Sequence, residues 1–126
     1  MKRFVLACLG VVAVVAGDSV AAHHSTATYD HTVKKTLSGT VVEFGWTNPH
    51  AYIQVDVANE SGGTDRWAIA MGTPTSLVRS GWKSTLLKPG DRVTVVVNPL
   101  KNGDHGGWIV SITLPDGRTL GTKALE

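Results

Sequence analysis

Apolar and polar side chains alternate along five segments of this chain, and a repeat of two residues is typical of β-strands. In the clearest segment, Ile53, Val55 and Val57 lie on one side while Tyr52 and Gln54 lie on the other. We therefore predict strands over residues 36–46, 52–57, 66–71, 92–97 and 108–114. The expected core comprises Val42, Phe44, Ile53, Val55, Trp67, Ile69, Val93, Val95, Val110 and Ile112.

The segment between the third and fourth strands has the signature of a helix instead. Thr73 suits a helix N-cap, Pro74 the first helical position and Gly81 a left-handed stop, so one short helix is predicted over residues 73–80. The order strand-strand-strand-helix-strand-strand is that of an OB-fold, a small five-stranded Greek-key barrel. We predict an all-β fold with one short helix and an OB-like barrel; a generic five-stranded barrel or sandwich is the alternative.

The N-terminal segment has the layout of a secretory signal peptide. Lys2 and Arg3 precede an apolar run over residues 4–16, and small residues follow up to Ala22. The apolar run is shorter than the roughly 20 residues that cross a membrane. We therefore expect cleavage after Ala21 or Ala22 and a periplasmic or otherwise secreted protein.

Removal of residues 1–22 leaves 104 of the 126 residues, enough for a single domain with one core. We divide this mature chain into a polar N-terminal arm over residues 23–35, the barrel over residues 36–120 and a tail over residues 121–126. Cys8, the one cysteine, is lost with the signal peptide, so the mature domain has no disulfide.

The mature chain is close to electrically neutral, with 10 basic and 9 acidic residues. A nucleic-acid-binding protein more often carries a marked basic stripe. We therefore expect no nucleic acid partner, and contact with a membrane only during export. The expected partners are a metal ion or a small ligand, or another exported protein.

Two adjacent histidines, His23 and His24, follow the predicted cleavage site. A free α-amine beside imidazoles is a nitrogen-rich site that favours copper among the divalent first-row ions. If the chain begins at Ala22, the amine, two backbone nitrogens and His24 form the square-planar set of copper(II) or nickel(II). If it begins at His23, the amine and imidazole chelate one copper, and His50 is the natural third nitrogen.

Copper is therefore the expected cofactor, with His23, His24 and His50 as its ligands. The alternative for His50 is that it and Asn48 satisfy backbone groups in a turn around Pro49. The other two histidines, His31 and His105, are expected to be solvated.

An aromatic platform is the second candidate site. Trp46, Asn48 and Tyr52 surround the loop between the first two strands, beside the face where OB-like barrels bind ligands. The other tryptophans are expected to serve mostly in packing. Since the chain contains no Gly-x-Ser-x-Gly, His-Glu-x-x-His or phosphate-loop motif, a copper-dependent redox enzyme with an N-terminal histidine brace is the remaining enzyme alternative.

Several uncommon words occur in order along the chain: Ala22-His23-His24-Ser25, Leu37-Ser38-Gly39-Thr40-Val41, Trp46-Thr47-Asn48-Pro49-His50-Ala51, Gly81-Trp82, Leu87-Lys88-Pro89-Gly90-Asp91 and Leu114-Pro115-Asp116-Gly117-Arg118. In these words the chain resembles a bacterial family of small exported proteins classed as domain of unknown function 6152. The resemblance implies an exported β-barrel domain and a role for the histidine pair and the Asn-Pro-His word, but no substrate. The expected function is that of an exported binding or accessory protein. A protein- or glycan-binding module that uses the aromatic platform is the alternative to copper binding.

Overall fold

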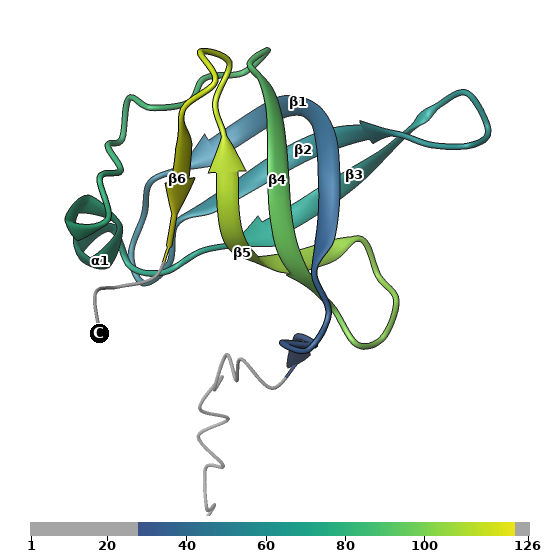
Figure 1. Cartoon of the computed structure of the whole chain (residues 1–126), viewed down its shortest axis with the longest axis horizontal. Helices are drawn as coiled ribbons and strands as arrows, with labels where there is room; N and C mark the ends of the chain where they lie inside the picture. The colour runs from purple at the N-terminus through teal and green to yellow at the C-terminus, as the bar shows by residue number, and fades with distance from the viewer. Residues whose placement is uncertain (1–27, 123–126) are drawn as a thin grey trace, which may run out of the picture.

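The computed structural model describes residues 28–122, in which five strands close into a barrel and a short sixth strand lies at the edge of the sheet (Figure 1). The elements are β1 (Lys35–Gly45), β2 (Tyr52–Ala58), β3 (Thr64–Ala70), α1 (Pro74–Arg79), β4 (Arg92–Pro99), β5 (Gly106–Thr113) and β6 (Thr119–Gly121). Among the residues in this range, no helix is both long and apolar enough to cross a membrane.

The barrel closes because β1 pairs with both β2 and β4, and because β3 pairs with β5. The strand order is β3-β2-β1-β4-β5-β6, and β3 also pairs in parallel with β5, with Ala68 opposite Gly106. Gly39 lies where β1 pairs with both β2 and β4, and a Cβ there would lie 2.3 Å from the carbonyl oxygen of Asp56. This closed order, with α1 between β3 and β4, confirms the predicted OB-like barrel with one short helix.

The barrel interior holds most of the predicted core, but two predicted positions are wrong. Val42 and Val110 are only half-buried, whereas Val41 and Ile109 are each 1% exposed. The cause is a β-bulge in each strand: the pairing with β2 skips Val42, and the pairing with β4 skips Val110. One extra residue moves every later side chain to the opposite face. Phe44 is partly buried and packs against the core.

One end of the barrel is covered by α1 and the segment after it (Figure 1). The Thr73 side chain accepts a hydrogen bond from the backbone nitrogen of Ser76, which confirms the predicted N-cap. Leu77 and Trp82 are each 1% exposed, and Trp82 Nε1 donates to the Gly121 carbonyl oxygen at 3.1 Å. That contact ties the covered end to β6, a strand too short to show alternation in the sequence.

The later half of the predicted arm is part of the fold. The backbone nitrogen of Asp30 donates to the Pro99 carbonyl at 2.8 Å, and Lys101 donates to the Thr28 carbonyl at 3.0 Å. Tyr29 forms an isolated β-bridge with Leu100. Residues 28–33 therefore lie against the loop between β4 and β5, and only the earlier part of the arm lies outside the described residues.

Asn98 of β4 fixes the position of this segment. Its side chain is 7% exposed, its Nδ2 donates to the Val33 carbonyl at 2.8 Å, and its Oδ1 lies 3.3 Å from Nδ1 of His31. A buried amide that finds partners on the arm holds the arm in one place. His31, expected to be solvated, is exposed but lies within hydrogen-bonding distance of Asn98.

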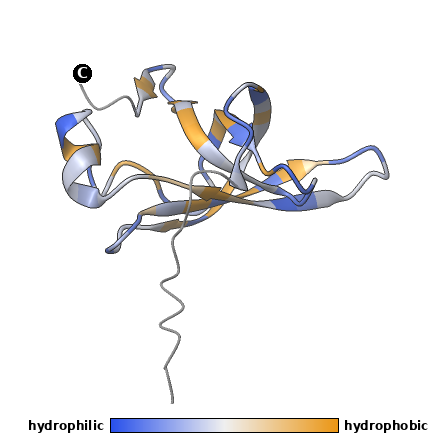
Figure 2. Ribbon diagram, turned by 90° about the horizontal axis from the view of Figure 1, so that it is seen from below, coloured by the Kyte–Doolittle hydropathy of each residue, from blue (hydrophilic) through white to orange (hydrophobic). Residues whose placement is uncertain are grey.

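The β2–β3 hairpin extends away from the barrel (Figure 1), and its tip is hydrophilic (Figure 2). Arg66 and Asp56 face each other across this hairpin, with Nε to Oδ1 at 2.9 Å and a second bond from the guanidinium to Oδ2 at 3.1 Å. The hydrogen bonding from Arg66, with a smaller contribution from its positive charge, lowers the pKa of Asp56 below its usual value. The hairpin therefore ends in a solvated, charge-paired surface.

Candidate functional site

The predicted copper ligands fall in two regions of the chain. His23 and His24 lie outside the described residues. His50 precedes β2, is half-buried, and its ring lies edge-on to Trp108 with the centroids 6.1 Å apart. Within residues 28–122, no three His, Cys, Asp or Glu side chains gather closely enough to hold a metal ion. The described part of the chain thus contributes His50 alone to the predicted metal set.

The aromatic platform residues have different surroundings. Trp46 packs edge-on against Phe44, with ring centroids 5.7 Å apart, and lies partly buried against the core. Asn48 is exposed in the loop before β2, where the Asn48–Pro49 peptide bond is cis. Tyr52 lies on the outer face of the sheet. Of the three, Tyr52 is therefore the one whose ring is built into an outward-facing surface.

The ring of Tyr52 is fixed by two residues of β1. It lies over Gly45, where a Cβ would fall 2.1 Å from the nearest ring atom, so a larger residue would displace the ring. Its hydroxyl donates to Glu43 Oε1 at 2.6 Å. This hydrogen bond, with smaller contributions from desolvation and the negative charge of Glu43, raises the pKa of Tyr52 above its usual value. One face of the ring rests on the strand, which leaves the opposite face for a ligand.

A groove adjoins Tyr52 on the outside of β2 and β3. Tyr52 pairs with Ala70 and Gln54 pairs with Ala68, so the four side chains share the outer face. The intervening Ile53 and Ile69 are buried inside the barrel. We call this concavity the outer groove; its side chains come from Tyr52, Gln54, Ala68, Ala70, Leu100, Asp104, His105 and Tyr29. The two alanines make a floor of methyl groups between larger walls.

The wall opposite Tyr52 is formed by the arm. Tyr29 lines the groove, and its ring lies 5.9 Å from that of Trp108, which in turn contacts His50. Trp108 pairs with Ala70 in the parallel β3–β5 contact. Burial raises the pKa of Tyr29. The three rings therefore form a continuous aromatic group, of which Tyr29 lines the outer groove.

His105 stands at the end of the outer groove, in the β4–β5 loop. Its ring lies 5.1 Å from that of Trp67, and its Nε2 lies 3.6 Å from Asp65 Oδ2. Lys35 Nζ lies 5.0 Å from the same Trp67 ring. His105 was expected to be solvated; it is about half exposed and packs on the tryptophan that closes this end of the barrel.

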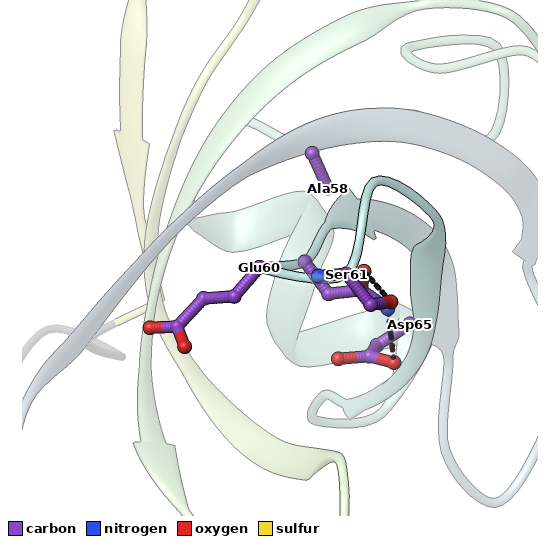
Figure 3. A pocket seen from close by; sticks show the side chains of 5 residues that line it. Ala58, Glu60, Ser61 and Asp65 are labelled. Carbon is purple, nitrogen blue, oxygen red and sulfur yellow. Dashed lines mark hydrogen bonds between the residues drawn. The ribbon is translucent and has the colours of Figure 1, made fainter.

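Two other depressions lie on the surface. One is the concave side of the hairpin turn, lined by Ala58, Glu60, Ser61 and Asp65 (Figure 3). There, Asn59 accepts from Ser61 Oγ at 2.7 Å and donates to Asp65 at 3.0 Å, so the polar groups stabilise the turn itself. The other lies over β1, β4 and β5, is lined by Ser38, Val93, Thr94 and Leu114 among others, and contains no aromatic side chain.

The sequence predicts Tyr52 as a residue of the binding site. It does not predict the other groove residues Tyr29, Ala68, Ala70 and His105. For the two alanines a signal was available, because alternation along 66–71 places them opposite the inward-facing Trp67 and Ile69. Small residues on the outer face of a strand next to a candidate aromatic platform indicate an open floor. The sequence contains no such signal for Tyr29, because the position of Tyr29 beside the groove depends on its β-bridge with Leu100.

Comparison with known proteins identifies the family. The model of a family described as "Family of unknown function (DUF6152)" matches residues 10–109, which confirms the resemblance noted in the sequence. No curated protein matches the chain. A solved structure similar to this chain is that of the mitochondrial single-stranded DNA binding protein Rim1 of S. cerevisiae. The two share 14% sequence identity with a TM-score of 0.47, and the match covers 65% of this chain and 93% of that protein.

The similarity to a single-stranded DNA binding protein contradicts the expectation that excluded nucleic acid as a partner. That expectation rested on the near-neutral charge of the whole mature chain. Net charge sums over every face of a protein and does not report how charge is distributed on any one of them. The exclusion of nucleic acid on the ground of net charge is therefore withdrawn.

Proposed function

This chain belongs to the DUF6152 family of unknown function, and we propose that it is an exported binding protein that takes up its ligand in the outer groove. The observation that carries the proposal is the fixed ring of Tyr52 beside the alanine floor. An ordered aromatic ring next to uncovered sheet offers apolar contact area at little cost in side-chain entropy.

The position of the groove supports a binding role. Barrels of this fold use the face of strands two and three and the adjoining loops to bind ligands. The outer groove lies on β2 and β3 and is bounded by the β4–β5 loop and the arm. Its lining is mostly apolar with a few polar groups, the composition expected of a small-molecule site.

Binding fits the groove better than catalysis, because its titratable side chains already make structural contacts. Glu43 accepts from Tyr52, Asp104 accepts from Asn102 at 2.9 Å, and His105 packs on Trp67. A catalytic acid or base needs a position from which it reaches the reacting atom. These groups instead hold the rings and the loop in place.

Export is supported by the sequence pattern of residues 1–22, in which Lys2 and Arg3 precede an apolar run and small residues follow up to Ala22.

A fragment screen by NMR tests the proposed function. Ring-containing fragments should shift the amide resonances of Gln54, Ala68 and His105, because these residues lie in the outer groove. Ala70→Leu fills the floor and should abolish those shifts, whereas Ala58→Leu at the hairpin should leave them unchanged. Fragments that bind only at other surfaces, with the groove resonances unmoved, would contradict the proposal.

Copper binding is a second candidate function, favoured by the position of the arm. Tyr29 lies beside Trp108, and Trp108 contacts His50. His24 is four residues before Thr28, and four extended residues span at most about 14 Å. The terminal amine, His23 or His24, and His50 together supply the nitrogens that copper(II) prefers.

Titration of copper(II) into the correctly processed protein, followed by electron paramagnetic resonance, tests this second candidate. Alanine at both His23 and His24 should abolish the signal of nitrogen-bound copper, and one extra residue ahead of the natural terminus should weaken it. If replacement of His50 by alanine weakens copper binding, the loop between β1 and β2 completes the site. Replacement of His105 serves as the control. Equal binding by the variant that lacks both terminal histidines would exclude copper as the ligand of this terminus.

A further inference from the structure

We infer that the outer groove binds an uncharged oligosaccharide, an inference that rests on the proposed binding function and specifies its ligand. Three features of the groove lead to this ligand class: a fixed aromatic face, a shallow floor of small side chains, and a polar rim with no cationic side chain. Each feature matches one property of a sugar ring.

The aromatic face comes from Tyr52. Its ring lies against Gly45 and is held there through the hydroxyl bond to Glu43 at 2.6 Å. A sugar ring carries several C–H groups on one face, and the negative face of an aromatic ring attracts such weakly positive hydrogens. Because the tyrosine is already ordered, stacking a sugar on it costs little further side-chain entropy.

The floor and the far wall fit a chain of rings better than a single bulky group. Ala68 and Ala70 present only methyl groups, and Tyr29 stands on the other side of them. Tyr29 is itself supported by Trp108 at 5.9 Å. One sugar stacked on Tyr52 therefore leaves room over the alanines for its neighbour to approach Tyr29.

The polar rim sets the charge of the ligand. Among the described residues that line the groove, Gln54, Asp104 and His105 are the polar side chains, and none is lysine or arginine. Two cations of the neighbouring strands make contacts of their own, Arg66 with Asp56 and Lys35 over Trp67. Carboxylate and amide oxygens accept hydrogen bonds from hydroxyl groups, which an oligosaccharide supplies in number.

The test uses the full chain, processed by the cell that exports it, and probes of different charge. The probes are hexasaccharides of glucose and of N-acetylglucosamine, the oligonucleotide oligothymidylate, and the peptide hexalysine. Amide chemical shifts give the position of binding and isothermal titration gives its strength. At least one hexasaccharide should bind in the groove, and Tyr52→Ala should weaken it by about tenfold or more.

Two matched variants make that result specific. Tyr52→Phe keeps the ring but loses the bond to Glu43, so it should bind the sugar more tightly than Tyr52→Ala and less tightly than the natural chain. Val78→Ala, on the exposed side of α1, should not change the affinity. Binding of oligothymidylate or hexalysine in the groove without binding of either sugar would overturn the ligand class and leave the proposed binding function standing. Absence of groove shifts with every probe and with the ring fragments would overturn both. Sugar binding that survives Tyr52→Ala unchanged would overturn the stacking geometry and this inference with it.

Discussion

Tyr52 depends on two residues of β1, and each can be tested separately. Gly45 provides the surface under the ring, and Glu43 accepts the hydroxyl hydrogen at 2.6 Å. Gly45→Ala should therefore displace the ring and remove ligand binding, while the barrel, whose core lies on the other side of the sheet, still folds. Tyrosine fluorescence anisotropy and the groove amide shifts would report the displacement; an unmoved ring would contradict the close contact.

The bond to Glu43 also makes a prediction about pH. A neutral Tyr52 hydroxyl can donate to the carboxylate and a tyrosinate cannot, so the pKa of Tyr52 lies above its usual value of about 10. The contact thus stabilises the fold below that pH and is lost as the pH rises through the raised pKa. In a Tyr29→Phe background, where Tyr52 is the one tyrosine, absorbance of tyrosinate should appear at lower pH once Glu43 is replaced by Gln. An unchanged titration would exclude the hydrogen bond.

At the scale of elements, the bulge in β1 decides which valine supports the core. Val41 is 1% exposed and Val42 is half-buried. Val41→Ala should lower the free energy of unfolding by about 1–3 kcal/mol through lost burial and a residual cavity, and Val42→Ala should cost less. Urea denaturation of both variants measures the difference. A larger loss of stability for Val42→Ala would mean that β1 has no bulge and that Val42, not Val41, faces the core.

The arm is a second element with a testable attachment. Asn98→Ala removes the side chain that bonds the Val33 carbonyl and approaches His31. It should cost about 0.5–1.5 kcal/mol, because the hydrogen bonds of a buried amide are lost. Hydrogen exchange at the amides of Asp30 and Lys101, which bond across to Pro99 and Thr28, should become faster. Val78→Ala, on the exposed side of α1, is the control. Unchanged exchange in the Asn98 variant would show that the arm binds without the Asn98 side chain.

The strands and the helix were predictable because their signals are local. Alternation along 52–57 and the Thr73-Pro74 start of α1 depend on residues next to one another in the sequence. The two bulges were not, since each falls in a pair of adjacent apolar residues, Val41-Val42 and Ile109-Val110, where either member could face the core. The short strand β6 was not predictable, because so few residues do not show alternation.

The candidate site was predictable only in part, because it is assembled by contacts between distant segments. Tyr52 follows from its position beside the loop between the first two strands. Tyr29 reaches the groove through its bridge to Leu100, and Trp108, whose ring contacts Tyr29, is placed by the parallel pairing with Ala70. A single sequence does not specify pairings across such separations. His23 and His24 stay a prediction, as they lie outside the described residues.

At the scale of the whole molecule, export predicts a defined N-terminus. Mass spectrometry of the mature protein should find a chain that starts at Ala22 or His23, carries no lipid and lies outside the cytoplasm. Recovery of intact Met1 on a membrane-anchored protein would refute export by a cleaved leader.

The central claim is that the outer groove is the binding site of this protein, and intermolecular NOEs from alanine methyl groups test it most directly. With a bound hexasaccharide or ring fragment, the methyl groups of Ala68 and Ala70 should show NOEs to ligand protons, because they form the floor between Tyr52 and Tyr29. Methyl groups of Val93, Thr94 and Leu114, around the depression over β1, β4 and β5, should show none. NOEs confined to that second set, with Ala68 and Ala70 silent, would contradict the claim.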